Sequence, residues 1–373
     1  MKIVAIPDSF KGCLSAGRVS AILKKAADET LDNVDFVSLP MADGGEGTLD
    51  VLHRALGGTF FSHDVTGACG QPVRARYLSV GPTAYVEFAE AAGLSKRLPG
   101  FNAANTTSLG VGQIMVRAIE AGHRHIVVAL GGSCTNDCGA GMATALGVSF
   151  EAANGQRFIP VGRTLSQVKA IRLNPLFFTK DGVRIEALCD VTNPLYGPEG
   201  AAQVFGPQKG ATAEDIELME AGAKTIDMIF QSAKGPKLNT IRGTGAAGGA
   251  GAGMIAFLNG ALLSGTETML ELMKFEEVAR DADLIVTGEG AVDAQTLTGK
   301  LISGVAKRAA GRPVVVLTGS AEGNLDALYD AGVTAVFPIA RAPKDKSEAM
   351  STAAADLLAT AKDVFRLTRS LKA

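Results

Sequence analysis

Short runs of Val, Ile and Leu alternate along the chain with stretches in which apolar side chains recur every three or four residues. This alternation is typical of strands followed by helices, as in 15–28, where Val19, Ile22 and Leu23 share one helical face. Helical stretches of this kind separate short strands near the two ends of the chain, so we expect an α/β domain with a doubly wound, parallel, five-stranded sheet. The predicted strands are 2–7, 35–39, 283–286, 313–317 and 335–339.

The middle of the chain has a different pattern. Between 60 and 91 the segments are short, polar at alternate positions and separated by Gly-Pro or Gly-Gln-Pro turns, which predicts hairpins at 73–80 and 83–88. Buried strands are expected at 125–130 and 183–188, and a charged helix at 213–231.

The simplest topology inserts this middle part between the second and third strands of the first domain. Residues 1–59 plus 264–373 would then form one α/β domain, and residues 60–263 would form a second, inserted α/β domain. Two connections would join the domains, and such an arrangement permits a hinge.

Composition narrows the class of protein. Glycine accounts for 45 of 373 residues, about 12%, against a usual value of roughly 7%, which favours binding loops built from backbone. The 36 basic and 38 acidic side chains nearly cancel, so the chain lacks the field needed to hold a nucleic acid or an anionic membrane, and a small-molecule partner is expected. No apolar run approaches the ~20 residues of a membrane span or resembles a signal peptide, so we expect a cytoplasmic protein.

The five cysteines are odd in number and widely scattered, which does not resemble a disulfide framework. Cys134 and Cys138 are four residues apart and could share a helix face, but neither a second pair nor a nearby histidine completes a zinc site. Buried thiols are the favoured interpretation.

Residues just past the carboxyl ends of parallel strands line the ligand crevice of such sheets. In the first predicted domain these residues are Asp8, Ser9, Lys11, Asp43, Glu46, Glu289, Asp293, Thr318, Gly319 and Ser320. In the inserted domain they are Gly131, Gly132, Ser133, Cys134, Thr135, Asn136, Asp137, Asp190 and Asn193.

The loop 131–137 lies between a strand and a helix and has two interpretations. Its glycine pair, hydroxyl and amide side chains could form a phosphate cradle at a helix N-terminus, although it is not a Walker loop. Alternatively it is a tight turn in which Asp137 or Thr135 caps the helix.

Two further segments have a functional and a structural alternative. Six glycines lie within residues 243–253. Close helix packing requires fewer glycines than this, so the number favours a loop that binds a nucleotide. Glu289 and Asp293 could bind Mg²⁺ near a phosphate or merely cap a helix. Lys11 and Lys300, placed in the same loops, have the flexible point charge that suits a phosphoryl group.

Several separate segments resemble the bacterial glycerate kinases of the first type, in the same order and over essentially the full length. The segments are 6–12 (IPDSFKG), 40–48 (PMADGGEGT), 131–137 (GGSCTND) with 139–142, 189–195 (CDVTNPL), 196–202 (YGPEGAA), 205–210 (FGPQKG) and 287–300, which begins TGEG. The resemblance implies ATP-dependent, Mg²⁺-requiring phosphorylation of D-glycerate to 2-phosphoglycerate in the use of glyoxylate, glucarate or galactarate carbon. It also implies a flavodoxin-like first domain with a second α/β domain inserted in it.

The hypothesis for the mechanism places glycerate in the cleft between the domains, where transfer depends on positioning and charge neutralisation. The catalytic candidates are Asp190, which would orient or deprotonate the hydroxyl, Asp8, which could exchange roles with it, and Lys11. The candidates for nucleotide and phosphate binding are Gly131, Gly132, Ser133, Thr135, Asn136, Asp137, Gly245, Gly248, Gly249 and Lys300. Ser9, Asn193, Thr318 and Gly319 are the candidates for the substrate, and Asp43, Glu289 and Asp293 for Mg²⁺.

Two other classes of protein share parts of this pattern. A nucleotide-cofactor oxidoreductase also uses doubly wound sheets, but the first strand lacks the G-x-G-x-x-G turn. A two-domain binding protein for a small hydroxy acid shares the hinge, but has little use for carboxylates beside lysines. The oligomeric state is left open, and a homodimer is compatible with the sequence.

Overall fold

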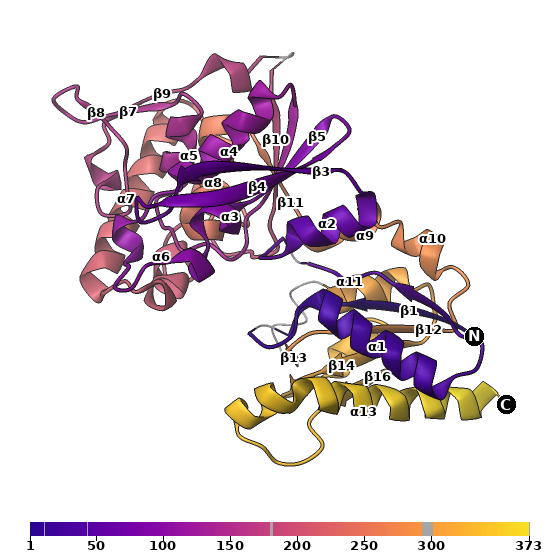
Figure 1. Ribbon diagram of the computed structural model, residues 1–373. Helices are drawn as coiled ribbons and strands as arrows, with labels where there is room; N and C mark the ends of the chain where they lie inside the picture. Colours follow the sequence, from indigo (N-terminus) through magenta and orange to yellow (C-terminus); the bar gives the residue numbers. More distant parts are fainter. Residues whose placement is uncertain (11, 43, 180–181, 293–300, 373) are drawn as a thin grey trace. The chain divides into compact units, whose positions relative to one another are not determined.

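The computed structural model describes residues 1–10, 12–42, 44–179, 182–292 and 301–372, and it separates into two compact units (Figure 1). The first unit consists of residues 1–43 and 266–373, and the second of residues 44–265. The second unit is thus inserted in the chain of the first, between its second and third strands.

The first unit contains a five-stranded sheet in which every pair of neighbours is parallel, in the order β16-β14-β12-β1-β2. The strands are β1 (Lys2–Pro7), β2 (Asp35–Ser38), β12 (Leu284–Gly288), β14 (Val314–Thr318) and β16 (Ala335–Pro338), with a short separate pair of β13 (Ala291–Val292) and β15 (Ser320–Ala321). The central strands β1, β12 and β14 are almost continuous apolar runs, as expected for strands buried on both faces. The prediction of a parallel sheet is confirmed.

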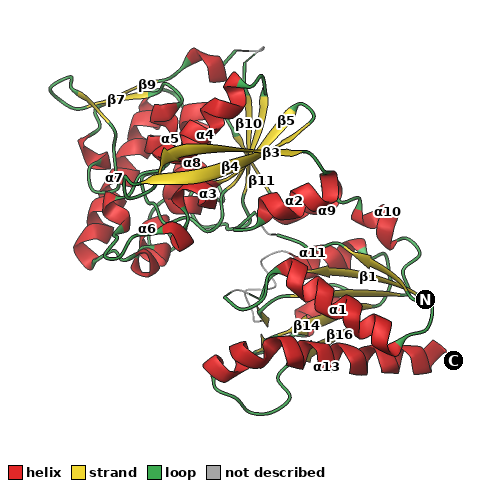
Figure 2. Ribbon diagram, in the orientation of Figure 1, coloured by secondary structure: helices red, strands yellow, loops and turns green. Residues whose placement is uncertain are grey.

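Helices cover both faces of this sheet. They are α1 (Ala16–Thr30) and α13 (Lys346–Lys372) on one face and α11 (Leu301–Arg308) and α12 (Asp326–Asp330) on the other. Two further helices, α9 (Gly265–Leu272) and α10 (Phe275–Ala279), precede β12 in the chain. Apolar residues of α1 and α13 form one core with the sheet, and these two helices lie side by side in Figure 2. Ile302 and Ala306 of α11 and Leu328 of α12 form a second core with Val316.

The 27-residue helix α13 was not predicted. Its buried residues Ala353, Leu357, Ala361, Val364 and Phe365 recur every three or four positions and form one apolar face, whereas Leu367 and Leu371 are exposed. Packing against α1, rather than local propensity, stabilises it.

The second unit contains a mixed six-stranded sheet in the order β11-β10-β6-β5-β4-β3. The strands are β3 (Thr59–Thr66), β4 (Pro72–Val80), β5 (Thr83–Glu87), β6 (His125–Ala129), β10 (Arg184–Leu188) and β11 (Ala261–Leu263). Strands β3, β4 and β5 pair in antiparallel hairpins, and β5, β6, β10 and β11 run parallel to one another. The predicted hairpins and both predicted buried strands are confirmed.

The remaining elements of the second unit surround this sheet. The helices are α2 (Thr48–Leu56), α3 (Phe88–Ala92), α4 (Leu109–Glu120), α5 (Ala140–Ala145), α6 (Ala201–Phe205), α7 (Ala213–Ser232) and α8 (Ala246–Leu258), and a small sheet contains β7 (Ser149–Glu151), β8 (Arg157–Phe158) and β9 (Ala170–Arg172). The predicted charged helix corresponds to α7, which begins with a capping box formed by Thr212 and Asp215.

The observed units begin and end at other residues than the predicted domains. The first boundary lies at 43/44 instead of 59/60, because α2 packs against β4 and β5 and is bonded to Glu87 of the second unit. The second lies at 265/266, two residues from the predicted 263/264.

We expect Leu357→Ala in α13 to lower the free energy of unfolding by about 2–5 kcal/mol, because Leu357 is fully buried against α1 and the sheet. Leu371→Ala is the matched control in the same helix, since Leu371 is 79% exposed, and its effect should stay within about 0.5 kcal/mol. Urea titrations of the two variants and the parent measure both values. Equal losses would contradict the assignment of the apolar face of α13.

Candidate functional site

Three neighbouring strands of the first unit end in predicted site residues. The N–H of Asp8 donates to the carbonyl of Gly288 at 2.9 Å, so the loops after β1 and β12 leave the sheet together, with Glu289 next in the chain. Asp8 is 8% exposed, and one of its carboxylate oxygens accepts the N–H of Ser9 at 2.6 Å. The structure therefore brings Asp8, Ser9 and Glu289 together at one edge of the sheet.

Thr318 and Gly319 follow the adjacent strand β14 at the same edge. The hydroxyl of Thr318 is buried and donates to the carbonyl of Ser320 at 2.8 Å, which gives this side chain a role within the turn. A Cβ at Gly319 would lie 2.4 Å from the carbonyl oxygen of Gly290, so the close approach of two backbones requires glycine. Contact of either residue with a substrate stays a prediction.

Four predicted residues lie outside the described residues. They are Lys11, Asp43, Asp293 and Lys300. Of the three predicted Mg²⁺ ligands, the structure therefore describes Glu289. Among the described residues no cluster of three or more His, Cys, Asp or Glu side chains could hold a metal ion.

In the second unit the segment Gly44–Gly47 lies directly on the loop that follows β6. The N–H of Gly131 donates to the carbonyl of Gly44 at 2.8 Å, and a Cβ at Gly131 would lie 2.3 Å from Cα of Gly45. Glycine is needed at this position because two backbones touch here. The N–H of Gly131 is thus used within the protein, contrary to its predicted place among free amides of a phosphate cradle.

Asp137 has the capping role that was the structural alternative for this loop. Its side chain is fully buried and accepts hydrogen bonds from the N–H groups of Ser108, Gly139 and Gly141 at 2.7, 3.0 and 3.2 Å and from the hydroxyl of Ser108 at 2.8 Å. The carboxylate of Asp137 therefore occupies the amides at the start of α5, where a phosphate had been expected. Burial raises the pKa of Asp137, and these four donors oppose the rise.

Between Gly131 and Asp137 the loop carries polar groups that face Lys209, a residue that was not predicted as part of the site. Lys209 is 3% exposed, and its amine donates to Oγ of Ser133 and to the carbonyl of Thr135, both at 2.9 Å. Burial lowers its pKa to about 8. The hydroxyl oxygen of Thr135 and Oδ1 of Asn136 are buried without a hydrogen-bond partner in the described structure.

Lys209 lies within the segment 205–210, which carried part of the family resemblance, but a lysine in a sequence is usually a solvated side chain. Only the burial of its amine among acceptors of the loop distinguishes it. Because Lys209 donates to Ser133, the hydroxyl proton of Ser133 must point to another acceptor.

Asp190 and Asn193 follow β10, next to the strand that leads into the Gly131 loop. Asp190 is partly exposed, and the hydroxyl of Ser264 donates to its Oδ1 at 2.9 Å. The amide of Asn193 donates instead to the carbonyl of Glu199 at 2.8 Å, so it shapes its own loop. Ser264 thus holds the carboxylate of Asp190.

The glycine-rich run 243–253 includes the start of α8, where Ala247, Gly248 and Gly249 have positive φ. A Cβ at Gly248 would lie 2.0 Å from the carbonyl oxygen of Thr135, and one at Gly245 would lie 2.2 Å from that of Pro194. Close packing of this run on the loops after β6 and β10 explains its glycines, so the argument from their number was wrong. A role of Gly245, Gly248 or Gly249 in nucleotide binding stays a prediction.

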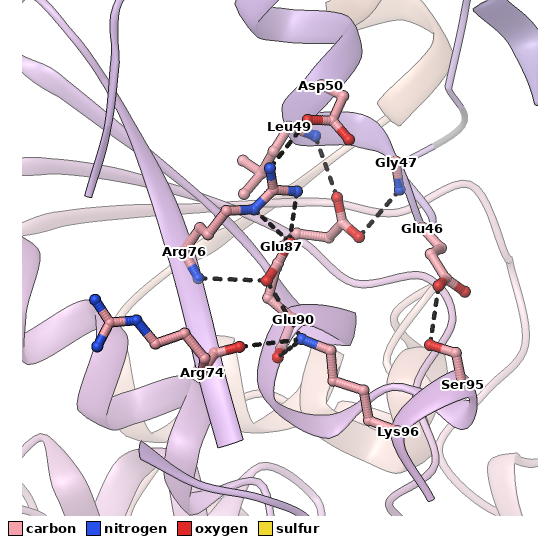
Figure 3. A network of polar contacts seen from close by, with 10 residues as sticks. All are labelled: Glu46, Gly47, Leu49, Asp50, Arg74, Arg76, Glu87, Glu90, Ser95 and Lys96. Atoms are coloured by element: carbon pink, nitrogen blue, oxygen red, sulfur yellow. Dashed lines mark hydrogen bonds and ion pairs between the residues drawn. The ribbon is translucent and has the colours of Figure 1, made fainter. Parts of the chain in front are cut away.

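A buried carboxyl group that sequence reasoning missed lies at the end of β5. Glu87 is 4% exposed and accepts the N–H groups of Gly47 and Leu49 at 3.0 and 3.1 Å (Figure 3). No motif marks it, because it follows an ordinary alternating strand. The predicted hairpin segment 83–88 nevertheless contains this acid, and a glutamate within a strand that becomes buried is unusual enough to be a signal.

Cys134 and Cys138 are buried free thiols, as expected. Burial raises the pKa of Cys134 to about 11 and also raises that of Cys138, so both thiols are protonated and inert near neutral pH. No helix within the described residues combines the length and apolar character needed to span a membrane.

Fold and site together define an α/β protein of two units, each with polar residues gathered at the carboxyl ends of parallel strands. Residues 3–369 match the model of the glycerate kinase family. The chain belongs to the glycerate kinase family, and is thus an enzyme of the kinase class. The membership favours this class over the oxidoreductase and binding-protein alternatives.

Known proteins similar to the chain agree with this membership. Glycerate kinase of Bacillus subtilis is 38% identical over 98% of this chain and 97% of its own length. Glycerate 2-kinase of Escherichia coli is 38% identical over 91% of this chain and 90% of its own length. A crystal structure assigned as glycerate kinase 2 of Salmonella typhimurium LT2 superposes with a TM-score of 0.82 at 36% identity and covers 100% of this chain and 99% of that chain.

We expect Gly131→Ala to destabilise the second unit by about 1–3 kcal/mol, because its Cβ would overlap the backbone at Gly45. Gly304→Ala in α11 is the control, since its Cβ would meet side-chain atoms at 3.3 Å or more and alanine favours the helix. Differential scanning calorimetry measures both. Unchanged stability of Gly131→Ala would contradict the contact between the two loops.

Lys209 should make the stability of the protein depend on pH. Its pKa is lower in the folded protein than in the unfolded chain, so the unfolded chain binds more protons above pH 8 and this group's contribution to stability rises with pH. Relative to Lys209→Met, the parent should gain about 1 kcal/mol of unfolding free energy between pH 7 and pH 9. Lys224→Met, at a lysine whose side chain is 53% exposed, should follow the parent in urea titrations at both values. Identical pH dependence in Lys209→Met would contradict the buried charge.

Proposed function

We propose that this enzyme transfers the γ-phosphoryl group of ATP to the 2-hydroxyl of D-glycerate, with Mg²⁺. Membership of the glycerate kinase family supports the substrate, and the name of the Escherichia coli relative, glycerate 2-kinase, supports the position that is phosphorylated. We place the reaction in the cytoplasm and in the use of glyoxylate or related acids.

The observation that carries the proposal is the clustering of polar residues at the carboxyl edges of both sheets. Asp8 and Glu289 leave the first sheet together, while Gly131 and Asp190 leave adjacent strands of the second. Ligands of open α/β sheets bind at such edges. Numbered within the first unit, its strands run 2-1-3-4-5, which supports the flavodoxin-like assignment and puts β1 and β12 at the point where the strand order reverses.

Asp190 is the proposed group that orients or deprotonates the glycerate hydroxyl. The bond from Ser264 fixes its carboxylate, and partial exposure leaves it within reach of a ligand. Asp8 is more buried, and the N–H of Ser9 stabilises its ionised form, which suits a fixed negative charge better than a proton acceptor.

Oxygen donors at the edge of the first sheet fit a magnesium ion. Glu289 directly follows Gly288, whose carbonyl accepts the N–H of Asp8, and Mg²⁺ prefers carboxylate oxygens together with waters and phosphates. Glu289, with Asp43 and Asp293, would hold the ion. When bound, Mg²⁺ would neutralise the charge of the phosphate oxygens.

The other roles follow from position. Ser133, Thr135 and Asn136 offer hydroxyl and amide groups beside the buried amine of Lys209, and they are proposed to contact the nucleotide phosphates. Lys11 and Lys300 are proposed to neutralise the transferring phosphoryl group. Ser9, Asn193, Thr318 and Gly319 would then shape the place of the glycerate.

A coupled assay of ADP release tests the proposed reaction. We expect turnover with D-glycerate and little with L-glycerate or without acceptor, because transfer requires the hydroxyl to be aligned with the γ-phosphate. Phosphorus NMR of the product identifies the phosphorylated oxygen. Release of ADP that does not depend on the acceptor would contradict the proposal.

Asp190→Asn should lower kcat by about 10²-fold or more if the carboxylate accepts the hydroxyl proton, because this is the usual cost of losing a general base. The amide can still accept from Ser264, so the fold should be retained. Asp64→Asn is the control, because Asp64 is exposed and its replacement should leave kcat unchanged. Asp227 is unsuited as a control because it is buried. A decrease of less than tenfold would assign the role to another group.

A further inference from the structure

Helix α2 begins without a capping side chain of its own. Its N-cap residue is Gly47, with a φ of 91°, which has no side chain that could accept the first N–H groups of the helix. Glu87 provides the missing acceptors from β5: its two carboxylate oxygens accept the N–H groups of Gly47 and Leu49 (Figure 3). Ionised carboxylates are the strongest acceptors for such amides.

The charged neighbours of Glu87 are paired among themselves. Arg76 of β4 pairs with Glu90 of α3 and Asp50 of α2, and Lys96 pairs with Glu90. Glu46 accepts the hydroxyl of Ser95, and it carries no ion pair in the part of the chain that the structure describes. Among those residues, no cation pairs with Glu87.

The position of Gly47 matters for the proposed site. From Gly47 the chain leads back through Glu46 and Gly45 to Gly44, whose carbonyl accepts the N–H of Gly131. Gly132 also faces Glu46 across this contact, because a Cβ at Gly132 would lie 3.6 Å from Cβ of Glu46. The segment 44–47 is therefore held at one end by the Gly131 loop and at the other by Glu87.

We propose that Glu87 is a positioning residue for phosphoryl transfer, whose ionised carboxylate holds the segment 44–47 against the loop that follows β6. This inference rests on the proposed function. It identifies Glu87 as a pH-sensitive anchor of the site: the carboxylate accepts two N–H groups, whereas the protonated acid turns one oxygen into an O–H donor that faces an N–H donor.

Burial raises the pKa of Glu87 to about 7, with a further rise from the charges of Glu90 and Glu46, while the two N–H groups act in the opposite direction. The anchor is thus complete above neutral pH and loses one hydrogen bond as the pH falls below it.

Glu87→Gln tests the inference, because glutamine has the shape of the protonated acid. We expect kcat at pH 8 to fall about tenfold or more with KM for glycerate changed much less, and the rise of kcat between pH 6 and pH 8 to disappear. At pH 6 parent and variant should converge. Glu90→Gln is the matched control: it lies in the same network, but the amides of Gly47 and Leu49 are bonded to Glu87. It should keep the parent's kcat at pH 8, while the rise of kcat moves to lower pH because the charge of Glu90 raises the pKa of Glu87.

A second measurement needs neither activity nor a variant. Hydrogen exchange of the Gly47 and Leu49 amides in the full-length parent, corrected for the intrinsic pH dependence of exchange, should slow between pH 6 and pH 8 as the carboxylate ionises. In Glu87→Gln one of the two amides should exchange fast at both values, because the glutamine side chain has a single acceptor oxygen.

The outcomes separate this inference from the proposed function. If the parent shows no acceptor-dependent release of ADP, the proposed function is overturned. The hydrogen exchange of the Gly47 and Leu49 amides would still show whether Glu87 holds segment 44–47. Glycerate kinase activity with a parent-like pH profile in Glu87→Gln would overturn the positioning role alone. Amide protection that does not change between pH 6 and pH 8 in the parent, or a Glu90→Gln variant that behaves like Glu87→Gln, would overturn it as well.

Discussion

Parallel pairing of β6 with β5 on one side and β10 on the other sets the position of every candidate residue in the second unit. In this register Glu87 and Leu188 both lie opposite Ala129, so the three strands reach the same edge together. A slip by one residue would turn each following side chain to the other face of the sheet. The Gly131 loop, Asp190 and the anchor at Glu87 all depend on this one register.

Buried polar groups then fix the loops that leave the edge. Asp137 accepts amides of two helices, Lys209 donates to Ser133 and Thr135, and Glu87 accepts amides of α2. A buried charge without such partners costs several kcal/mol, so each contact strongly disfavours other loop conformations. A loop held in this way can keep its remaining donors aimed at a highly charged ligand without reorganisation during the reaction.

Glycines also fix the conformations of these loops. Contacts of backbone with backbone at Gly245 and Gly248 leave no room for a Cβ, so the loops after β6 and β10 and the start of α8 form one compact layer. The high glycine content therefore reflects the packing of loops on one another at least as much as access for a ligand.

The sequence by itself determined the strands, the parallel sheet, the insertion of one unit in the other and the family, because local periodicity and ordered motifs carry this information. It also placed Asp8, Glu289, Gly131 and Asp190 at strand ends. Only the tertiary structure decided that Asp137 caps two helices and that Lys209 and Glu87 are buried beside the candidate loops. The role of a charged side chain depends on its burial and its partners, and these partners lie up to 76 positions away in the chain.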